Sequence, residues 1–414
     1  MSGESRLQKI SRHYGVVRMV FAILVLTAVP IIPAADVLSG YYRAGPVDGI
    51  TDVAGVRIAQ LTKIDGDGPL RPGEGPVRTG VTVILPNRDI WKQRVSAATF
   101  TLDGNGEMTG THLVDESGFL EVPIVLTDTL DIGRADDGVI DWMIEHHPEI
   151  GVSDDVPLPV VAECDDQFLN DIQGRHVRAA DVEATLDQAT GGQFARGNVG
   201  AGTGMVLFAF KGGIGSASRV LPRELGGYTV GVLVNANNGS QPRRDLVIDG
   251  VPVGRIFEHE YLPLIPKRAA LTAPPLPDGS IIVVVATDAP LEARQLHEVA
   301  LRAVLGLGRT GLTSRLSSGD FVIAFSTTRL IPRDTGRPTG LLETDDDRID
   351  ALFEATADAT QAAVYDALFS ARTMTGANGV TIYGLPVART RALLKRALQV
   401  AAGYEIRVLT LGGA

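Results

Sequence analysis

"VLVNANNGSQPRRDL", Val232–Leu246, joins an apolar run to a basic stretch through a few small polar residues. The aliphatic start predicts a buried strand, and the Asn-Asn-Gly-Ser segment predicts the turn that ends it. Asn-Gly is also the commonest signal for a tight hairpin turn, so a simple turn is one interpretation. The other interpretation is that the peptide bond between Gly239 and Ser240 is attacked by its own serine.

Self-cleavage at Gly239–Ser240 gives the serine the base that it needs. A serine hydroxyl is a weak nucleophile unless a neighbouring group takes its proton. An α-amine, with a pKa of about 7.7–8.0, can take a proton near neutral pH. Ser240 acquires that amine if its hydroxyl attacks the Gly239 carbonyl and water hydrolyses the resulting ester. Glycine leaves the attack unhindered, and the preceding asparagines can donate hydrogen bonds to the oxyanion.

The composition is that of an acidic globular protein. The 414 residues carry a formal net charge of -11 and are 44% hydrophobic. Nucleic-acid binding requires a basic surface, so we expect no nucleic-acid partner. Cys164 is the single cysteine, which excludes an internal disulfide bond.

The first 35 residues have the pattern of a secretory signal peptide. Basic residues precede the apolar run "MVFAILVLTAVPIIPAADV", which contains small residues at Ala34 and Ala35. This order predicts export to the periplasm or the medium, and the alternative is an uncleaved membrane anchor. We expect residues 36–414 to form one domain.

Strands and helices alternate irregularly over the rest of the chain. Short β-branched runs predict strands at 80–87, 231–234, 280–290 and 320–327. Amphipathic runs predict helices at 291–308, 345–371 and 387–403, followed by a closing strand at 405–411. Because the regular βαβ rhythm is missing, a layered α/β sandwich with mixed or antiparallel sheets fits better than a doubly wound fold.

A glycine-rich run, "GNVGAGTGM" at Gly197–Met205, permits close approach of the backbone to a ligand. It lacks the preceding strand and following acid of a dinucleotide site, and no phosphate-loop lysine follows it. The remaining interpretations are a packed glycine turn or a pocket wall in which Asn198 offers an amide donor.

The histidines do not form a recognisable metal motif. His146 and His147 are adjacent, but "EHHPEI" lacks metal-ligand spacing, so a solvated helix end is predicted there. No serine lies in a Gly-x-Ser-x-Gly elbow. The sequence therefore predicts neither a metal ion nor a cofactor.

Several segments, in order, resemble the DmpA/BapA family of L-aminopeptidase/D-esterases and β-peptidyl aminopeptidases. They are "ITDVAGVRI", "GVTVILP", "GNGEMTGTHLVDESGFLEVPIVLTDT", "GNVGAGTGMVLFAFKGGIGSASR", "VGVLVNANNGSQPRRDLVIDGVPVG", "IIVVVATDAPL", "LGLGRTG", "SSGDFVIAFST" and "TMTGANGVTIYGLP". The resemblance implies an N-terminal-nucleophile enzyme with a four-layer αββα sandwich. It also implies a cut before Ser240, which leaves residues 36–239 as an α chain and 240–414 as a β chain. A homo-oligomer of such αβ heterodimers is implied as well.

The resemblance assigns roles to further residues. Asn198 takes the place of an oxyanion-hole asparagine. A glutamate that binds the substrate's free amino group is implied, with Glu121 as first choice and Glu116 as second. A carboxylate suits an ammonium group, although either residue can also be an exposed or helix-capping acid.

Serine partners of the nucleophile are implied too. Ser280 is the first candidate, with a strand-edge hydroxyl as the alternative. Ser318 and Asp320 are further candidates, although a Ser-Gly-Asp turn needs no function. The chain departs from the family pattern at Cys164 and Asp165, where an aromatic-containing stretch is expected, so the resemblance does not define side-chain preference.

The predicted function is therefore an autoprocessed serine aminopeptidase or amidase. Its substrate is a small peptide, amino-acid amide or ester with a free amine. A self-cleaving scaffold or binding protein without turnover is the alternative, and a nucleotide-binding protein ranks last.

Overall fold

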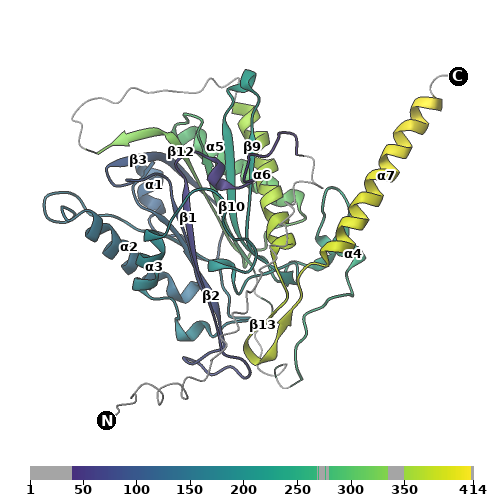
Figure 1. Ribbon diagram of the computed structural model, residues 1–414, viewed down its shortest axis with the longest axis horizontal. Coiled ribbons are helices and arrows are strands. Elements are labelled where there is room, and N and C mark those ends of the chain that lie inside the picture. Colours follow the sequence, from purple (N-terminus) through teal and green to yellow (C-terminus); the bar gives the residue numbers. More distant parts are fainter. Residues whose placement is uncertain (1–39, 268, 270–275, 277–278, 334–348, 412–414) are drawn as a thin grey trace, which may run out of the picture. The chain divides into compact units, whose positions relative to one another are not determined.

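The computed structural model describes residues 40–267, 269, 276, 279–333 and 349–411, with side chains described up to residue 400 (Figure 1). The described residues belong to one compact unit, Ala34–Ala414. The predicted export segment, 1–35, lies outside the described residues. None of the described helices is long and apolar enough to cross a membrane.

Two main sheets and two pairs of helices form the fold. The strands are β1 Arg57–Asp65, β2 Val77–Leu85, β3 Gln93–Gly104, β4 Phe119–Leu120, β5 Ile124–Thr127, β6 Val160–Glu163, β7 Val206–Leu207, β8 Phe210–Lys211, β9 Gly213–Val220, β10 Thr229–Asn237, β11 Ser280–Thr287, β12 Gly319–Pro332, β13 Met374–Thr375 and β14 Thr381–Ile382. The α-helices are α1 Thr111–Ser117, α2 Ile132–His146, α3 Ala179–Asp187, α4 Val253–Ile256, α5 Ala293–Arg309, α6 Ile349–Ser370 and α7 Val387–Leu411.

The sheets stack face to face between the helices. One sheet has the order β1-β2-β5-β6 and the other β4-β3-β12-β11-β10-β9. Apolar side chains fill the space between them, among them Val83 and Leu126 from the first sheet and Ile282 and Phe325 from the second. Helices α2 and α3 pack on the first sheet, and α5 and α6 pack on the second (Figure 1). This is the predicted four-layer αββα arrangement.

The strand pairing explains the sequence pattern. Pairs β5–β6 and β11–β12 are parallel, and the other pairs within the two main sheets are antiparallel. All nine residues of β10 are buried, because the second sheet is covered on both faces. Strand β1 lies at an edge and is half-exposed, with charged Lys63 and Asp65 along it. The predicted mixed sheets are confirmed.

The predicted end of the chain is wrong. We expected a helix ending at Gly403 and then a strand at 405–411, whereas α7 continues without interruption to Leu411. The tendency of β-branched residues to form a strand depends on packing against neighbouring strands. No strand of the described sheets pairs with this segment, so that tendency does not decide its structure.

The predicted cut at Gly239–Ser240 falls between interleaved strands. Strands β11 and β12 follow that bond in sequence, yet in the sheet they lie between β3 and β10, which precede it. The two segments defined by the bond therefore share one continuous hydrogen-bonded sheet.

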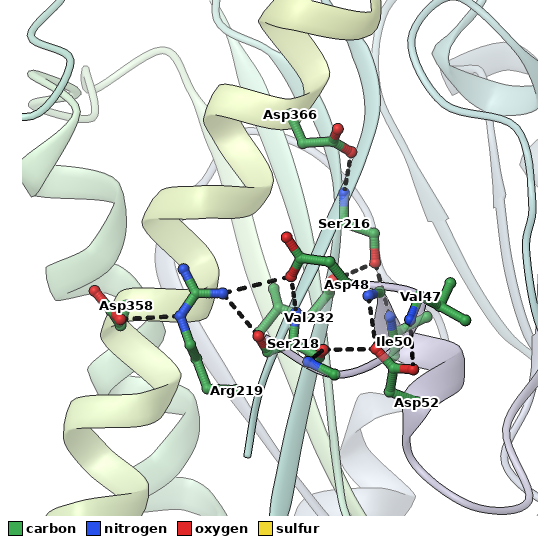
Figure 2. Close-up of polar contacts among 12 residues, drawn as sticks. Val47, Asp48, Ile50, Asp52, Ser216, Ser218, Arg219, Val232, Asp358 and Asp366 are labelled. Carbon is green, nitrogen blue, oxygen red and sulfur yellow. Dashed lines mark hydrogen bonds and ion pairs between the residues drawn. The ribbon is translucent and has the colours of Figure 1, made fainter. Parts of the chain in front are cut away.

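A buried polar network also joins the two segments (Figure 2). Arg219 on β9 lies 3.4 Å from the carboxylate of Asp48 and 2.9 Å from that of Asp358 on α6. The backbone N–H of Ser216 donates to Asp366 on α6 at 3.0 Å. Arg219 is 4% exposed, so loss of one partner leaves a buried charge poorly compensated.

Candidate active site

The Gly239–Ser240 turn lies directly after the central strand β10. Ser240 is half-buried, and its carbonyl accepts a hydrogen bond from Arg315 Nη1 at 3.0 Å. The next residue, Gln241, donates to Asp245 at 2.7 Å and accepts from Thr313 at 3.2 Å. The predicted strand and turn are thus confirmed, and the segment after β10 is held by the loop before β12.

Asn237, at the end of β10, ties three segments together. Its Oδ1 accepts from the N–H of Val206 at 2.8 Å, and its Nδ2 donates to the carbonyl of Asp165 at 2.7 Å. The same Nδ2 lies 3.4 Å from Ser280 Oγ, and Ser280 is the direct partner of Asn237 in the β10–β11 ladder. Because this amide is engaged at both ends, Asn237 holds the site in place rather than serving as a free oxyanion donor.

Asn238 has a different environment. Its side chain is fully buried, and among the described residues neither its Nδ2 nor its Oδ1 has a hydrogen-bond partner. A Cβ added to Gly279 would lie 2.5 Å from Asn238 Oδ1, so the amide lies against the backbone of Gly279. A buried unpartnered amide beside the proposed scissile bond is costly unless a reacting group uses it.

A cavity of about 240 Å³ opens beside these strand ends. It is lined by Asn105, Gly106, Thr129, Glu163, Asp165, Gln167, Leu276, Gly279, Ser280 and Ser317. Of the sequence-predicted residues, only Ser280 is in this lining. The lining contains two carboxylates, and none of its described members is a lysine, arginine or histidine.

Glu163 is the site residue that the sequence analysis missed. It ends strand β6, is 3% exposed, accepts a hydrogen bond from Thr129 Oγ1, and accepts the N–H of Glu107 at 3.2 Å. Burial raises its pKa to about 7, against the opposing effect of these hydrogen bonds. The signal in the sequence was a carboxylate at the end of the apolar run "PVVAE", where a buried strand has no structural need for a charge.

The structure does not bring Glu121 or Glu116 to the cavity. Glu121 is buried against Arg333, whose guanidinium forms an ion pair with it and lies 3.3 Å from the centre of the Trp91 ring. Burial raises the pKa of Glu121, and Arg333 and Arg94 oppose that effect. Glu116 is exposed on α1.

Asn198 lies next to the left-handed Gly197, outside the cavity lining. Gly197 pairs with Ile214 at the start of β9, so the glycine run packs against the sheet as a turn. Asn198 Oδ1 accepts the N–H of Arg372 at 3.0 Å, which fixes Nδ2 as the end that points elsewhere and can donate.

Ser318 and Asp320 lie next to Ser280. Gly319 pairs with Ser280 in the parallel β11–β12 ladder, and Ser318 Oγ donates to Asp320 Oδ1 at 2.6 Å. Burial raises the pKa of Asp320, and hydrogen bonds from Ser314 and Ser318 oppose the effect. Among the described residues, Asp320 Oδ2 has no hydrogen-bond partner.

The adjacent histidines form the end of a helix, as predicted. His146 is the last residue of α2, and its Nδ1 lies 2.9 Å from the carbonyl of Trp142. The described residues contain no cluster of three histidine, cysteine or acidic side chains that could hold a metal ion.

Residues 48–382 match the family described as Peptidase family S58. The chain belongs to peptidase family S58. It is 42% identical over 360 residues to the β-peptidyl aminopeptidase BapA of Sphingosinicella xenopeptidilytica, covering 85% of this chain and 88% of the relative. The BapA of Sphingosinicella microcystinivorans is also 42% identical, over 87% of this chain and 91% of its own length.

Solved structures agree with the S58 assignment. A Burkholderia β-aminopeptidase is similar at a TM-score of 0.78 and 37% identity, with 88% of this chain and 98% of that chain covered. The L-aminopeptidase D-Ala-esterase/amidase of Ochrobactrum anthropi, described as a prototype serine aminopeptidase with a variant N-terminal-nucleophile hydrolase fold, has the same TM-score and coverage at 38% identity. The predicted family, fold class and enzyme class are confirmed: this S58 chain is a serine aminopeptidase or amidase of the N-terminal-nucleophile type.

Proposed function

We propose that this S58 chain cuts its own backbone between Gly239 and Ser240, and that Ser240 is then the nucleophile for aminoacyl amides and esters. The observation that carries the proposal is the position of the Gly239–Ser240 turn. It directly follows the buried strand β10, whose last residue, Asn237, is hydrogen-bonded to Asp165 and Ser280 in the wall of the 240 Å³ cavity.

The cut proceeds through an ester. Ser240 Oγ attacks the carbonyl carbon of Gly239, the C–N bond breaks, and the proton of Oγ passes to the Ser240 nitrogen. Water then hydrolyses the ester, which leaves a Gly239 carboxylate and a Ser240 with a free amine. The unpartnered Asn238 amide is the donor we assign to the oxyanion on Gly239 during this step.

Turnover repeats the attack on a substrate carbonyl. The Ser240 amine accepts the Oγ proton and returns it to the leaving amine, and an acyl-enzyme forms that water releases. We assign the substrate oxyanion to Asn198 Nδ2 and backbone N–H groups. Ser280 and the hydrogen-bonded Ser318–Asp320 pair support the nucleophile from the neighbouring strands.

We assign the substrate's ammonium group to Glu163 rather than to Glu121 or Glu116. Glu163 lines the cavity, whereas Glu121 is paired with Arg333 and Glu116 is exposed. A charge-assisted hydrogen bond between Glu163 and an N-terminal amine fits an aminopeptidase that requires a free amine. By extension from the BapA relatives, the substrates include peptides and amides with an N-terminal β-residue.

Intact mass measurement of the purified protein tests the central step. Two fragments that divide at Ser240 are expected for the wild type, and one chain without turnover is expected for Ser240→Ala. The matched control Ser153→Ala removes an exposed hydroxyl and should leave both cut and turnover unchanged. A fully active enzyme in one uncut chain contradicts the proposal.

We also propose that residues 1–35 direct export and that the αβ heterodimers assemble into a homo-oligomer. The support for export is the basic start, the apolar run and the small residues at its end; the homo-oligomer is proposed only from the family resemblance. Amino-terminal sequencing of the fractionated protein distinguishes a cleaved signal peptide from a retained membrane anchor. Native mass spectrometry of the same sample gives the number of heterodimers.

A further inference from the structure

The cavity carries one more negative group than an N-terminal ammonium requires. Glu163 and Asp165 both line it, and its described lining residues include no cationic side chain. The proposed function uses Glu163 for the terminal amine. Asp165 therefore remains as a second carboxylate within the space that the substrate enters.

Hydrogen bonds hold Asp165 in one conformation. Its Oδ1 accepts the N–H of Gln167 and its Oδ2 accepts Gln167 Nε2, each at 2.8 Å. Its carbonyl accepts Asn237 Nδ2 at 2.7 Å, which fixes its backbone relative to the strand that leads to Ser240. Burial raises the pKa of Asp165, and the two hydrogen bonds from Gln167 oppose that effect because they favour the ionised form. Each carboxylate oxygen keeps a second lone pair for a ligand.

Two described cations, Arg315 and Lys211, are hydrogen-bonded to backbone carbonyls and form no ion pair with Asp165. Arg315 is exposed and donates to the carbonyl of Ser240. Lys211 is fully buried, and its Nζ bonds the carbonyls of Gly202, Met205 and Gly212. Among the described residues Asp165 has no ion-pair partner. Its charge is one of the secondary causes, after burial, of the raised pKa of Glu163.

We propose that Asp165 is a specificity-determining residue that selects substrates whose N-terminal residue carries a second positive charge, as in lysine or ornithine. This inference rests on the proposed function, because it requires the terminal amine to occupy Glu163. A half-buried carboxylate that has no ion-pair partner among the described residues gains a charge-assisted bond from an ammonium side chain and repels an acidic one.

The test compares three p-nitroanilides: lysyl, norleucyl and glutamyl. Lysyl and norleucyl residues have side chains of similar length and differ in charge. The wild type should hydrolyse the lysyl compound with the highest kcat/KM and the glutamyl compound with the lowest. Asp165→Asn should lower the lysyl-to-norleucyl ratio about tenfold, the usual size of one hydrogen bond to a charged group, and raise the glutamyl-to-norleucyl ratio.

Matched variants separate charge at the site from other effects. Asp137→Asn removes the same charge from the exposed face of α2 and should leave both ratios unchanged. Asp165→Glu keeps the charge and should keep the lysyl preference, which provides a second readout if Asp165→Asn does not fold.

The outcomes distinguish this inference from the proposed function. A wild type that prefers norleucyl to lysyl, or a loss in Asp165→Asn that is equal for all three compounds, overturns the specificity role and leaves the aminopeptidase intact. A wild type that hydrolyses none of the three, while its chain remains uncut, overturns the proposed function itself.

Discussion

Ser280 faces Asn237 directly across the β10–β11 ladder, and Asn237 Nδ2 lies 3.4 Å from Ser280 Oγ. The same amide nitrogen is 2.7 Å from the carbonyl of Asp165 in the cavity wall. One side chain, three residues before the proposed nucleophile, therefore sets the spacing between two strands and the segment that lines the substrate cavity.

Ser280→Ala and Asn237→Ala should fail in different ways. Ser280→Ala removes one long hydrogen bond, so the free energy of unfolding should fall by less than about 1 kcal/mol, while turnover should fall because a hydroxyl that we assign to support the nucleophile is lost. Asn237→Ala leaves the Val206 N–H and the Asp165 carbonyl without partners, so stability should fall by about 2–3 kcal/mol and self-cleavage should slow. Denaturation curves and a time course of chain cleavage measure the two effects. Full turnover in Ser280→Ala reduces that residue to a strand-edge hydroxyl.

Asn198→Ala tests the assignment of the oxyanion donor. Loss of one such donor commonly reduces kcat by about 10²–10³, and we expect that loss here with the chain still folded. The variant also removes the acceptor for the Arg372 N–H, which has a structural effect of its own. Measurement of kcat together with the melting temperature separates the catalytic effect from the structural effect. Lower stability with unchanged kcat means that Asn198 only anchors the segment after α6 by accepting the Arg372 N–H.

The protonation of Glu163 should make substrate binding depend on pH. Its pKa is raised to about 7, so the carboxylate is neutral below that pH and ionised above it. An ammonium group binds the ionised form, so KM for an aminoacyl anilide should fall roughly tenfold or more as pH rises from about 5.5 to about 7.5. An ordinary α-amine has a pKa of about 7.7–8.0. Because the Ser240 amine is assigned to proton transfer in the chemical step, its protonation should change kcat.

Glu163→Gln removes that dependence. KM should be high and nearly constant with pH in this variant, because the amide stays neutral. Glu145→Gln, an exposed carboxylate on α2, serves as the control and should retain the wild-type profile. A pH-dependent KM that persists in Glu163→Gln assigns amine binding to another group.

Glu121 and Arg333 should matter for stability and not for binding. Their side chains are 6% and 7% exposed, and Glu121→Gln leaves the guanidinium buried with Asp154 at 3.7 Å as its remaining acidic neighbour. Removal of one partner of a buried pair typically costs about 3–5 kcal/mol. Denaturation should be measured in the uncut Ser240→Ala background, where unfolding involves one chain. KM, measured in the cut enzyme, should not change. A raised KM with unaltered stability would restore Glu121 as the amine-binding residue.

The sequence predicted what local patterns encode. The buried run before Gly239, its terminating turn and the helices predicted at 291–308 and 345–371 follow from periodicity and turn residues that lie close together in the chain. The resemblance to known aminopeptidases then supplied the sandwich and the class of nucleophile.

The sequence did not predict which acids enter the cavity. Glu121 seemed a suitable amine-binding residue because its partner, Arg333, lies 212 positions further along the chain. Glu163 and Asp165 reach the cavity through the parallel pairing of β5 with β6 and through the bond from Asn237. Such placements depend on tertiary contacts, which no local pattern contains.

The strand order has a consequence for recovery from denaturation. Once the bond before Ser240 is broken, neither polypeptide holds adjacent partners for all of its strands, because β12 and β11 pair with β3 and β10 of the other piece. Renaturation of the mature enzyme is then an encounter between two molecules, and its rate should rise with protein concentration, whereas the uncut Ser240→Ala chain should refold at a rate independent of dilution. Cleavage therefore converts one chain that folds alone into two fragments, and their refolding depends on the concentration of both.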